Sequence, residues 1–254
     1  MKRESEIDST TVAKTIADQT YQQIRRDIIS GALPPGTKLA MEMLTKRYDV
    51  GLSPLREALV KLTGDALAVA EGQRGFWVSQ ISLDELQDTM NTRLLIETQA
   101  LSLAIEKGGP EWERAVTQAY EELSSLEDHL KEGEAATFTR WESANRRFHE
   151  ALVSACGSKW LIRLRSMLHY HSERYRMISL AEASVERDAH DEHEAIVEAV
   201  LGRKTLRACR LTELHLQRTT EAVRAALERR DEELLSKNKK RSLAGRRTGK
   251  SRPF

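Results

Sequence analysis

Four side chains in the second half of the sequence have types and spacings that suit a metal ion. Asn145 and His149 lie four residues apart, so on a helix they share one face. His193 and His215 follow in two later segments, each embedded in apolar residues. Three imidazoles and one amide oxygen that converge inside a helical bundle suit Zn²⁺, Ni²⁺ or a similar divalent ion. The alternative is a polar cavity in which these histidines hydrogen-bond without a metal.

The elements that must position these side chains are helices. Ser82 and Glu85 form a capping-box pattern, and from there onward the apolar spacing is helical. Glycines and one proline separate the segments at 108–110, 133, 157 and 202. The predicted helices cover 83–107, 111–132, 138–154, 159–180, 185–201 and 204–233. Six such helices must bury their apolar stripes on one another, which predicts an all-α six-helix bundle.

The first 80 residues follow a different plan. Helical spacing over 15–30 ends at a glycine, and Leu33-Pro34-Pro35-Gly36 must turn the chain. A short helix over 41–48, a tight turn and a second helix follow, with Ser53 expected to cap the second helix. Two apolar runs around a polar tip at 71–74 then predict a β-hairpin. This order indicates a winged helix-turn-helix, so the fold class is mainly α.

A winged helix-turn-helix presents the start of its second helix to the major groove of DNA. Ser53 and Arg56 occupy that end, and Arg56 could bind a guanine or a phosphate. Further polar and basic residues of this domain could hold the DNA backbone: Lys38, Lys46, Arg47, Gln73 and Arg74. The alternative for a lone basic residue such as Lys38 or Lys46 is a solvated charge.

Composition and charge limit the remaining possibilities. The formal net charge is +1, with a net acidic stretch over 81–230 and a net basic end. We therefore predict a DNA-binding domain over 12–80, a helical domain over 82–233 and a basic disordered tail over 234–254. The two cysteines form no CxxC pattern, so a reducing cytoplasm is expected. A membrane span is not expected, because no stretch approaches the roughly 20 apolar residues that it needs.

The segment LTKRYDVGLSPLREAL (44–59) resembles the signature of GntR-family transcription regulators, and EGQRGF (71–76) is similar to that family's wing. The second domain resembles the FCD effector-binding domain of the FadR subfamily, through NRRFH (145–149), EH (192–193) and His215. LAIEKGGPEWE (103–113) and CGSKWL (156–161) are similar to regulators of the carbon-starvation-induced type. The chain departs from the pattern at Leu52, where the family often has an arginine that touches DNA.

The resemblance implies a homodimer that binds double-stranded operator DNA and senses a small carboxylate near a metal ion. Asn145 stands where many FCD domains have an aspartate, so a weaker oxygen ligand is expected. Arg93 lies four residues before Glu97, an arrangement typical of this domain's first helix. It is interpreted either as a clamp for the effector carboxylate or as an ion-pair partner of Glu97. Arg176 is a second candidate for effector binding.

Two other classes of function were weighed against a ligand-responsive regulator, which is expected to be a repressor of a metabolic operon. A metal-dependent hydrolytic enzyme lacks a general base at a useful spacing and a nucleophile motif such as GxSxG. A protein-interaction module would not need the arginine at the start of the second helix or the basic wing. We therefore expect a regulator and no enzyme activity.

Overall fold

The computed structural model describes residues 15–127, 135–180 and 189–248. The chain separates into two compact units, residues 1–80 and residues 81–254. Each unit is described by itself. The predicted domain start at residue 12, the end of the helix predicted over 111–132, the start of the one predicted over 185–201 and the last residues of the tail lie outside the described residues.

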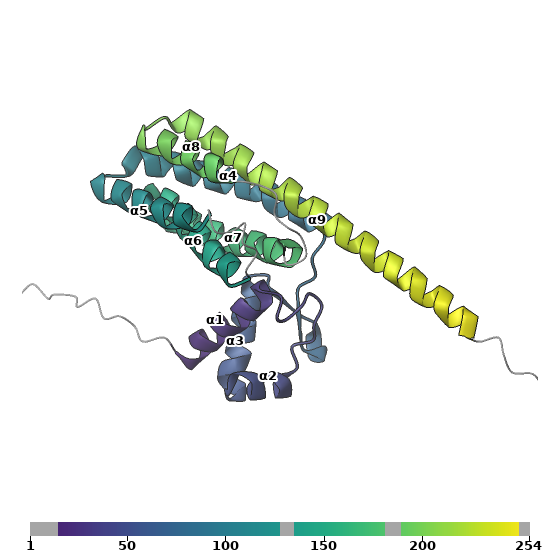
Figure 1. Cartoon of the computed structure of the whole chain (residues 1–254). Helices are drawn as coiled ribbons and strands as arrows, with labels where there is room; N and C mark the ends of the chain where they lie inside the picture. The colour runs from purple at the N-terminus through teal and green to yellow at the C-terminus, as the bar shows by residue number, and fades with distance from the viewer. Residues whose placement is uncertain (1–14, 128–134, 181–188, 249–254) are drawn as a thin grey trace, which may run out of the picture. The chain divides into compact units, whose positions relative to one another are not determined.

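The first unit has the order helix, helix, helix, hairpin (Figure 1). Its elements are α1 (Ile16–Ile29), α2 (Met41–Tyr48), α3 (Leu52–Gly64), β1 (Ala68–Ala70), a 3₁₀ turn η1 (Gly72–Arg74) and β2 (Phe76–Val78). The antiparallel strands pair Val69 with Trp77 at the centre of the hairpin. The predicted winged helix-turn-helix is confirmed.

The core of this unit forms because each helix buries one apolar face. Ile24 and Ile28 of α1 pack against Leu55, Leu59 and Leu62 of α3 in one cluster of fully buried side chains. Thr15 starts α1 with a capping box to Asp18, which satisfies backbone N–H groups of the first turn. The outcome is a small rigid support for the start of α3.

The start of α3 differs from the sequence-based expectation. Gly51, in an extended conformation, is the N-cap, so Ser53 already lies inside the first turn and makes no capping hydrogen bond. Pro54 is tolerated at the third helical position, since the N–H that it lacks has no acceptor within the helix there. The expectation that Ser53 caps α3 is therefore wrong.

The second unit is all-helical. Its elements are α4 (Leu83–Lys107), α5 (Pro110–Glu127), α6 (Ala135–Val153), a 3₁₀ turn η3 (Ser154–Cys156), α7 (Lys159–Leu180), α8 (His190–Leu201) and α9 (Thr205–Thr248). In Figure 1, α4 runs alongside α9. The core between these helices contains Leu101, Val116, Phe148, Ile196 and Val200. The predicted helical bundle is confirmed.

The first turn of α4 is held from a distant helix. The Ser82 side chain accepts a hydrogen bond from the Glu85 N–H at 3.1 Å, as the capping-box pattern predicts. The Glu85 carboxylate, however, is 2.9 Å from the hydroxyl of Tyr175 on α7, and the Ser82 N–H donates to that hydroxyl at 3.1 Å. Tyr175 is fully buried and thereby connects α7 to the beginning of the bundle.

The last helix ends later than expected. The sequence places its end at residue 233 and a tail without secondary structure from 234 onward, whereas α9 continues to Thr248. The continuation is rich in lysine, arginine and leucine, which have high helix propensity, and it contains no proline before residue 253. Among the described residues, no helix is long and apolar enough to cross a membrane.

Candidate functional site

Three helices bring three of the predicted ligands together. His149 on α6, His193 on α8 and His215 on α9 are all buried, and each offers a ring nitrogen within 4.8 Å of the others. Their ring centroids are 4.7 Å apart for His193 and His215 and 5.2 Å apart for His149 and His215. Because the ring nitrogen atoms lie within 4.8 Å of one another, they could bind one common ion.

Two glutamates set the tautomer of two of these rings. Nδ1 of His193 donates to Oε1 of Glu127 on α5 at 2.7 Å, and Nδ1 of His215 donates to Oε2 of Glu192 at 2.9 Å. With the proton on Nδ1, Nε2 carries the lone pair. Metal-binding histidines in proteins typically have such a carboxylate behind them.

Unsatisfied polar atoms point to the same place. Nε2 of His193 and Oδ1 of Asn145 are buried and have no hydrogen-bond partner among the described residues. Asn145 is one helical turn before His149 on α6 and is 4% exposed. Buried polar atoms without a partner are costly, which favours a missing ion or ligand at this position. The donor set of three imidazoles and one amide oxygen fits Zn²⁺ or Ni²⁺.

The ionisation of the cluster also suits a cation. Burial, together with the nearby His215 and His193, holds the pKa of His149 well below its ordinary value of 6.5. Burial alone would raise the pKa of Glu127, but the hydrogen bond from His193 and the electrostatic influence of that ring outweigh it, so that pKa is lowered. At neutral pH the cluster therefore presents a neutral His149 and an ionised Glu127.

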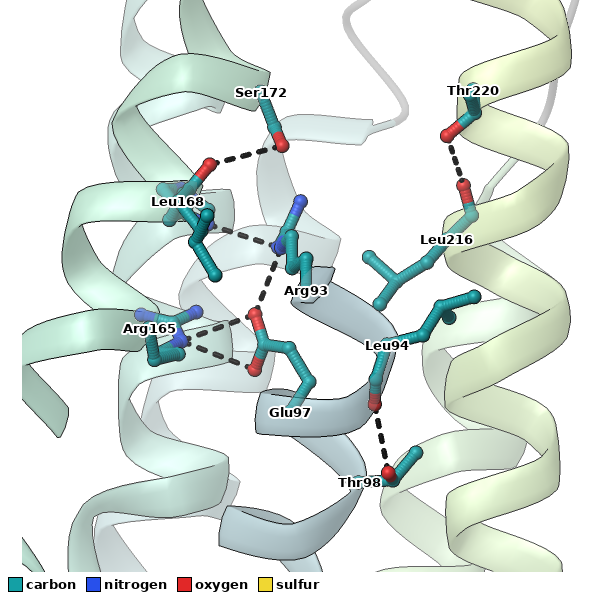
Figure 2. A network of polar contacts seen from close by, with 10 residues as sticks. Arg93, Leu94, Glu97, Thr98, Arg165, Leu168, Ser172, Leu216 and Thr220 are labelled. Atoms are coloured by element: carbon teal, nitrogen blue, oxygen red, sulfur yellow. Dashed lines mark hydrogen bonds and ion pairs between the residues drawn. The ribbon is translucent and has the colours of Figure 1, made fainter. Parts of the chain in front are cut away.

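Arg93 lies in a buried network between α4 and α7 (Figure 2). Its Nε donates to Oε1 of Glu97 at 3.0 Å, and its Nη2 donates to Nδ1 of His169 at 3.1 Å. Arg165, which the sequence analysis did not consider, donates from Nε to both oxygens of Glu97 at 3.2 and 3.1 Å. Of the two interpretations of Arg93, the structure contains the ion pair with Glu97.

Arg176 is engaged as well. Its Nε and Nη2 donate to the two oxygens of Glu142 at 2.7 and 2.9 Å, and both side chains are buried. Sequence reasoning also missed Arg165, Glu127 and the contact of Glu192 with His215. Glu192 is adjacent to His193 in the sequence, which gave no sign that its carboxylate contacts His215. Glu127 is 66 residues away from its partner His193, so no local pattern links the two.

The candidate DNA-binding residues are on one small unit and are all exposed. Arg56 on α3 makes no hydrogen bond or ion pair with the described residues, and Gln73 and Arg74 lie in the turn between the strands. Ser53 and the exposed Leu52 accompany Arg56 at the start of α3. These side chains are free to contact a ligand as large as DNA.

Three of the other candidates have partners. Arg47 is paired with Asp27 of α1, and Lys46 is paired with Glu42 at 2.9 Å. Nζ of Lys38 lies 5.4 Å from the centre of the Trp77 ring on β2. Exposed pairs of this kind are worth little and can be exchanged for phosphate contacts.

A winged helix-turn-helix with an exposed arginine on its second helix, followed by a helical domain with a buried polar site, defines the class of DNA-binding transcription regulators with a ligand domain. Comparison with known proteins agrees. The family profile "Bacterial regulatory proteins, gntR family" matches residues 16–78, and the "FCD domain" profile matches residues 88–218. The chain belongs to the GntR family of transcription regulators and carries an FCD effector-binding domain.

Relatives of known sequence and structure support this assignment. The chain is 37% identical to the uncharacterized regulator BphR of Paraburkholderia xenovorans, over 83% of this chain and 86% of that protein. It is 39% identical to the repressor GlaR of Escherichia coli, over 77% and 90%. The solved structure of E. coli McbR/YncC has the same fold, with a TM-score of 0.69 at 18% identity over 83% and 98% of the two chains. The family and these relatives are transcription regulators and not enzymes.

Proposed function

We propose that this GntR-family regulator is a repressor of a metabolic operon and releases its operator when a small carboxylate binds in the FCD domain. A divalent metal, held by His149, His193, His215 and Asn145, is the proposed anchor for that carboxylate. The observation that carries the proposal is the pair of hydrogen bonds from Nδ1 of His193 and His215 to Glu127 and Glu192. They place the protons of both rings on Nδ1, and Nε2 of His193 is buried and has no hydrogen-bond partner among the described residues, as a metal ligand requires.

The chemistry of the bound ion is simple. When Zn²⁺ or Ni²⁺ is bound, it supplies a Lewis-acidic centre for a carboxylate oxygen. The protein supplies the surrounding polarity. Arg93 remains charged, since burial lowers its pKa only to about 10. We assign effector binding to Arg93 and Arg176, each of which would exchange part of its pairing with a glutamate for the effector carboxylate.

One finding favours a repressor among the possible regulators. GlaR, which is 39% identical, is named a transcriptional repressor. We also propose that the chain belongs to the FadR subfamily, because it carries an FCD domain.

The proposed DNA contacts follow from exposure and helix geometry. Arg56 is assigned to a base edge, and Ser53, Lys38, Lys46, Arg47, Gln73 and Arg74 to the phosphate backbone. One winged helix reads one half-site, so we propose a homodimer formed through the helical domain.

Effector binding can reach the DNA-binding unit through the start of α4. Helix α7 carries His169 and Arg176, and its Tyr175 contacts Ser82, two residues after the boundary between the units. A ligand that favours one packing of α7 on α4 therefore also favours one position of Ser82. The extent of the response is set by the difference in effector affinity between the two packings.

The experiment has two parts. Protein purified without an affinity tag or chelator is analysed for metal, and the operator is obtained by selection from random DNA duplexes. We expect about one divalent ion per chain, and we expect carboxylates to lower operator affinity only while the ion is present. His193→Ala and His215→Ala should lose both the ion and the response. Protein that contains no metal and takes none up on titration would contradict the metal anchor.

A further inference from the structure

Two buried arginines share one carboxylate between α4 and α7. Arg93 and Arg165 both donate to Glu97, and each of these three side chains is at most 3% exposed. Figure 2 shows the carboxylate of Glu97 between the two guanidinium groups. Counted over the described residues, two positive charges and one negative charge leave one positive charge uncompensated at a buried position.

The nearby acidic side chains do not supply the missing charge. Glu142 is bound by Arg176 through both oxygens. Glu173 faces Arg146 at 3.3 Å. Among the described residues, these carboxylates are therefore already engaged by their own arginines.

The free donors of the network belong to Arg165 and His169. Nη1 and Nη2 of Arg165 are buried and have no hydrogen-bond partner among the described residues, and the same holds for Nε2 of His169. A guanidinium can only donate, so Nδ1 of His169 must accept from Arg93 and the ring proton must be on Nε2. All three nitrogen atoms thus present N–H groups and lack an acceptor.

Buried N–H groups without an acceptor, such as those of Arg165 and His169, are suited to bind an anion. A planar guanidinium presents a fork that fits the two oxygens of a carboxylate, and such charge-assisted hydrogen bonds are among the strongest in proteins. The site is also next to the proposed metal ligands, because the ring centroids of His149 and His169 are 6.3 Å apart. One small molecule could therefore reach both places.

We infer that Arg165 and His169 form an anion subsite distinct from the histidine cluster, and that the effector is a dicarboxylate. One carboxylate is held at the histidine cluster, and the second is held by the Nη1 and Nη2 groups of Arg165 and by Nε2 of His169. This inference rests on the proposed function, to which it adds the class of effector.

The test compares ligands that differ only in the second charge. Isothermal titration of the metal-loaded protein uses succinate, glutarate and adipate against butyrate, pentanoate and hexanoate, which have the same numbers of carbon atoms. The best dicarboxylate is expected to bind about ten- to a hundredfold more tightly than its carbon-matched monocarboxylate. Its monomethyl ester should bind like the monocarboxylate.

A variant assigns the preference to the subsite. Arg165→Lys keeps a cation beside Glu97 but removes the guanidinium fork, so the ratio of the two affinities should fall to about one. The matched control is Arg163→Lys, an exposed arginine on the same helix whose change should leave the ratio as it is. The comparison of the two ligand series uses the unaltered protein and stays decisive if Arg165→Lys does not fold.

Two negative outcomes have different meanings. Equal binding of dicarboxylates and monocarboxylates, or an unchanged ratio in Arg165→Lys, would overturn the subsite and leave the proposed carboxylate sensor intact. If no carboxylate of either series binds, the proposed function itself is wrong, and the subsite is wrong with it.

Discussion

Glu127 on α5 accepts a hydrogen bond from Nδ1 of His193 on α8 at 2.7 Å, although the two residues are 66 positions apart in the chain. This contact orients the imidazole and places its lone pair on Nε2. The first prediction tests it. Glu127→Gln should lower the affinity for Zn²⁺ or Ni²⁺ by about 10- to 100-fold, because the imidazole loses the anionic partner that raises its basicity. Competition with a chromophoric chelator measures the change.

The control for this variant is Glu121→Gln, since Glu121 is an exposed glutamate on the same helix. Its affinity for the metal should equal that of the unaltered protein. Equal affinities for all three proteins would show that Glu127 does not act on the metal.

The second prediction concerns stability. Glu97→Gln should lower the free energy of unfolding by about 3–5 kcal/mol, since it leaves Arg93 and Arg165 without their shared counter-charge in a buried site. Denaturant unfolding followed by circular dichroism measures this loss. Glu106→Gln, an exposed change on the same helix, should stay within about 0.5 kcal/mol of the unaltered protein. A loss of that small size in Glu97→Gln would contradict the network.

The third prediction concerns pH. Burial and the nearby cationic groups hold the pKa values of His149 and His169 well below 6.5 in the folded state. The unfolded chain therefore binds more protons as the pH falls below about 6.5, and stability must decrease with it. For metal-free protein the loss between pH 6.5 and 5.5 should be about 2 kcal/mol for the two histidines.

Denaturant unfolding at a series of pH values measures this slope. His169→Gln should show a shallower slope than the unaltered protein, because it removes one of the two groups. Glutamates with lowered pKa values, such as Glu97, add their own loss only below about pH 4.5, so the two windows are separate. A constant stability from pH 6.5 to 5.5 would mean that these rings are not kept neutral by the fold.

The fourth prediction concerns DNA. Arg56→Ala should keep the fold, because its side chain is exposed, and should weaken operator binding by about 1–3 kcal/mol if it contacts a base edge. Fluorescence anisotropy with the selected operator gives the affinity. Arg26→Ala removes an exposed arginine from α1 and controls for the loss of one positive charge. Arg56 has no part in recognition if both variants bind alike.

The fifth prediction concerns assembly. Sedimentation velocity should give a dimer of the 28.8 kDa chain at micromolar concentration, since two half-sites require two winged helices. A fragment of residues 81–254, if it folds, should also be dimeric. A monomer that binds its operator with full affinity would contradict the proposed homodimer.

The sequence by itself determined the order of elements and singled out the three histidines that converge in the helical domain. Leu55, Leu59 and Leu62 at helical spacing, followed by apolar runs around a polar turn, were sufficient to predict the winged helix-turn-helix. Such patterns are local, because the backbone periodicity alone decides which side chains share a face. His193 and His215 stood out as polar residues within apolar stripes, and His149 stood out because its spacing of four from Asn145 puts both on one helix face.

The tertiary structure alone decided which charges meet. Arg93 could have pointed toward an effector or toward Glu97, and the spacing of four residues allowed both. The packing of α7 on α4 brings Arg165 to the same carboxylate and His169 to Arg93. Within the part of the chain that the structure describes, the outer nitrogen atoms of Arg165 have no acceptor. Contacts between residues 68 or 76 positions apart depend on how helices pack in space, and the periodicity of a single helix carries no information about them.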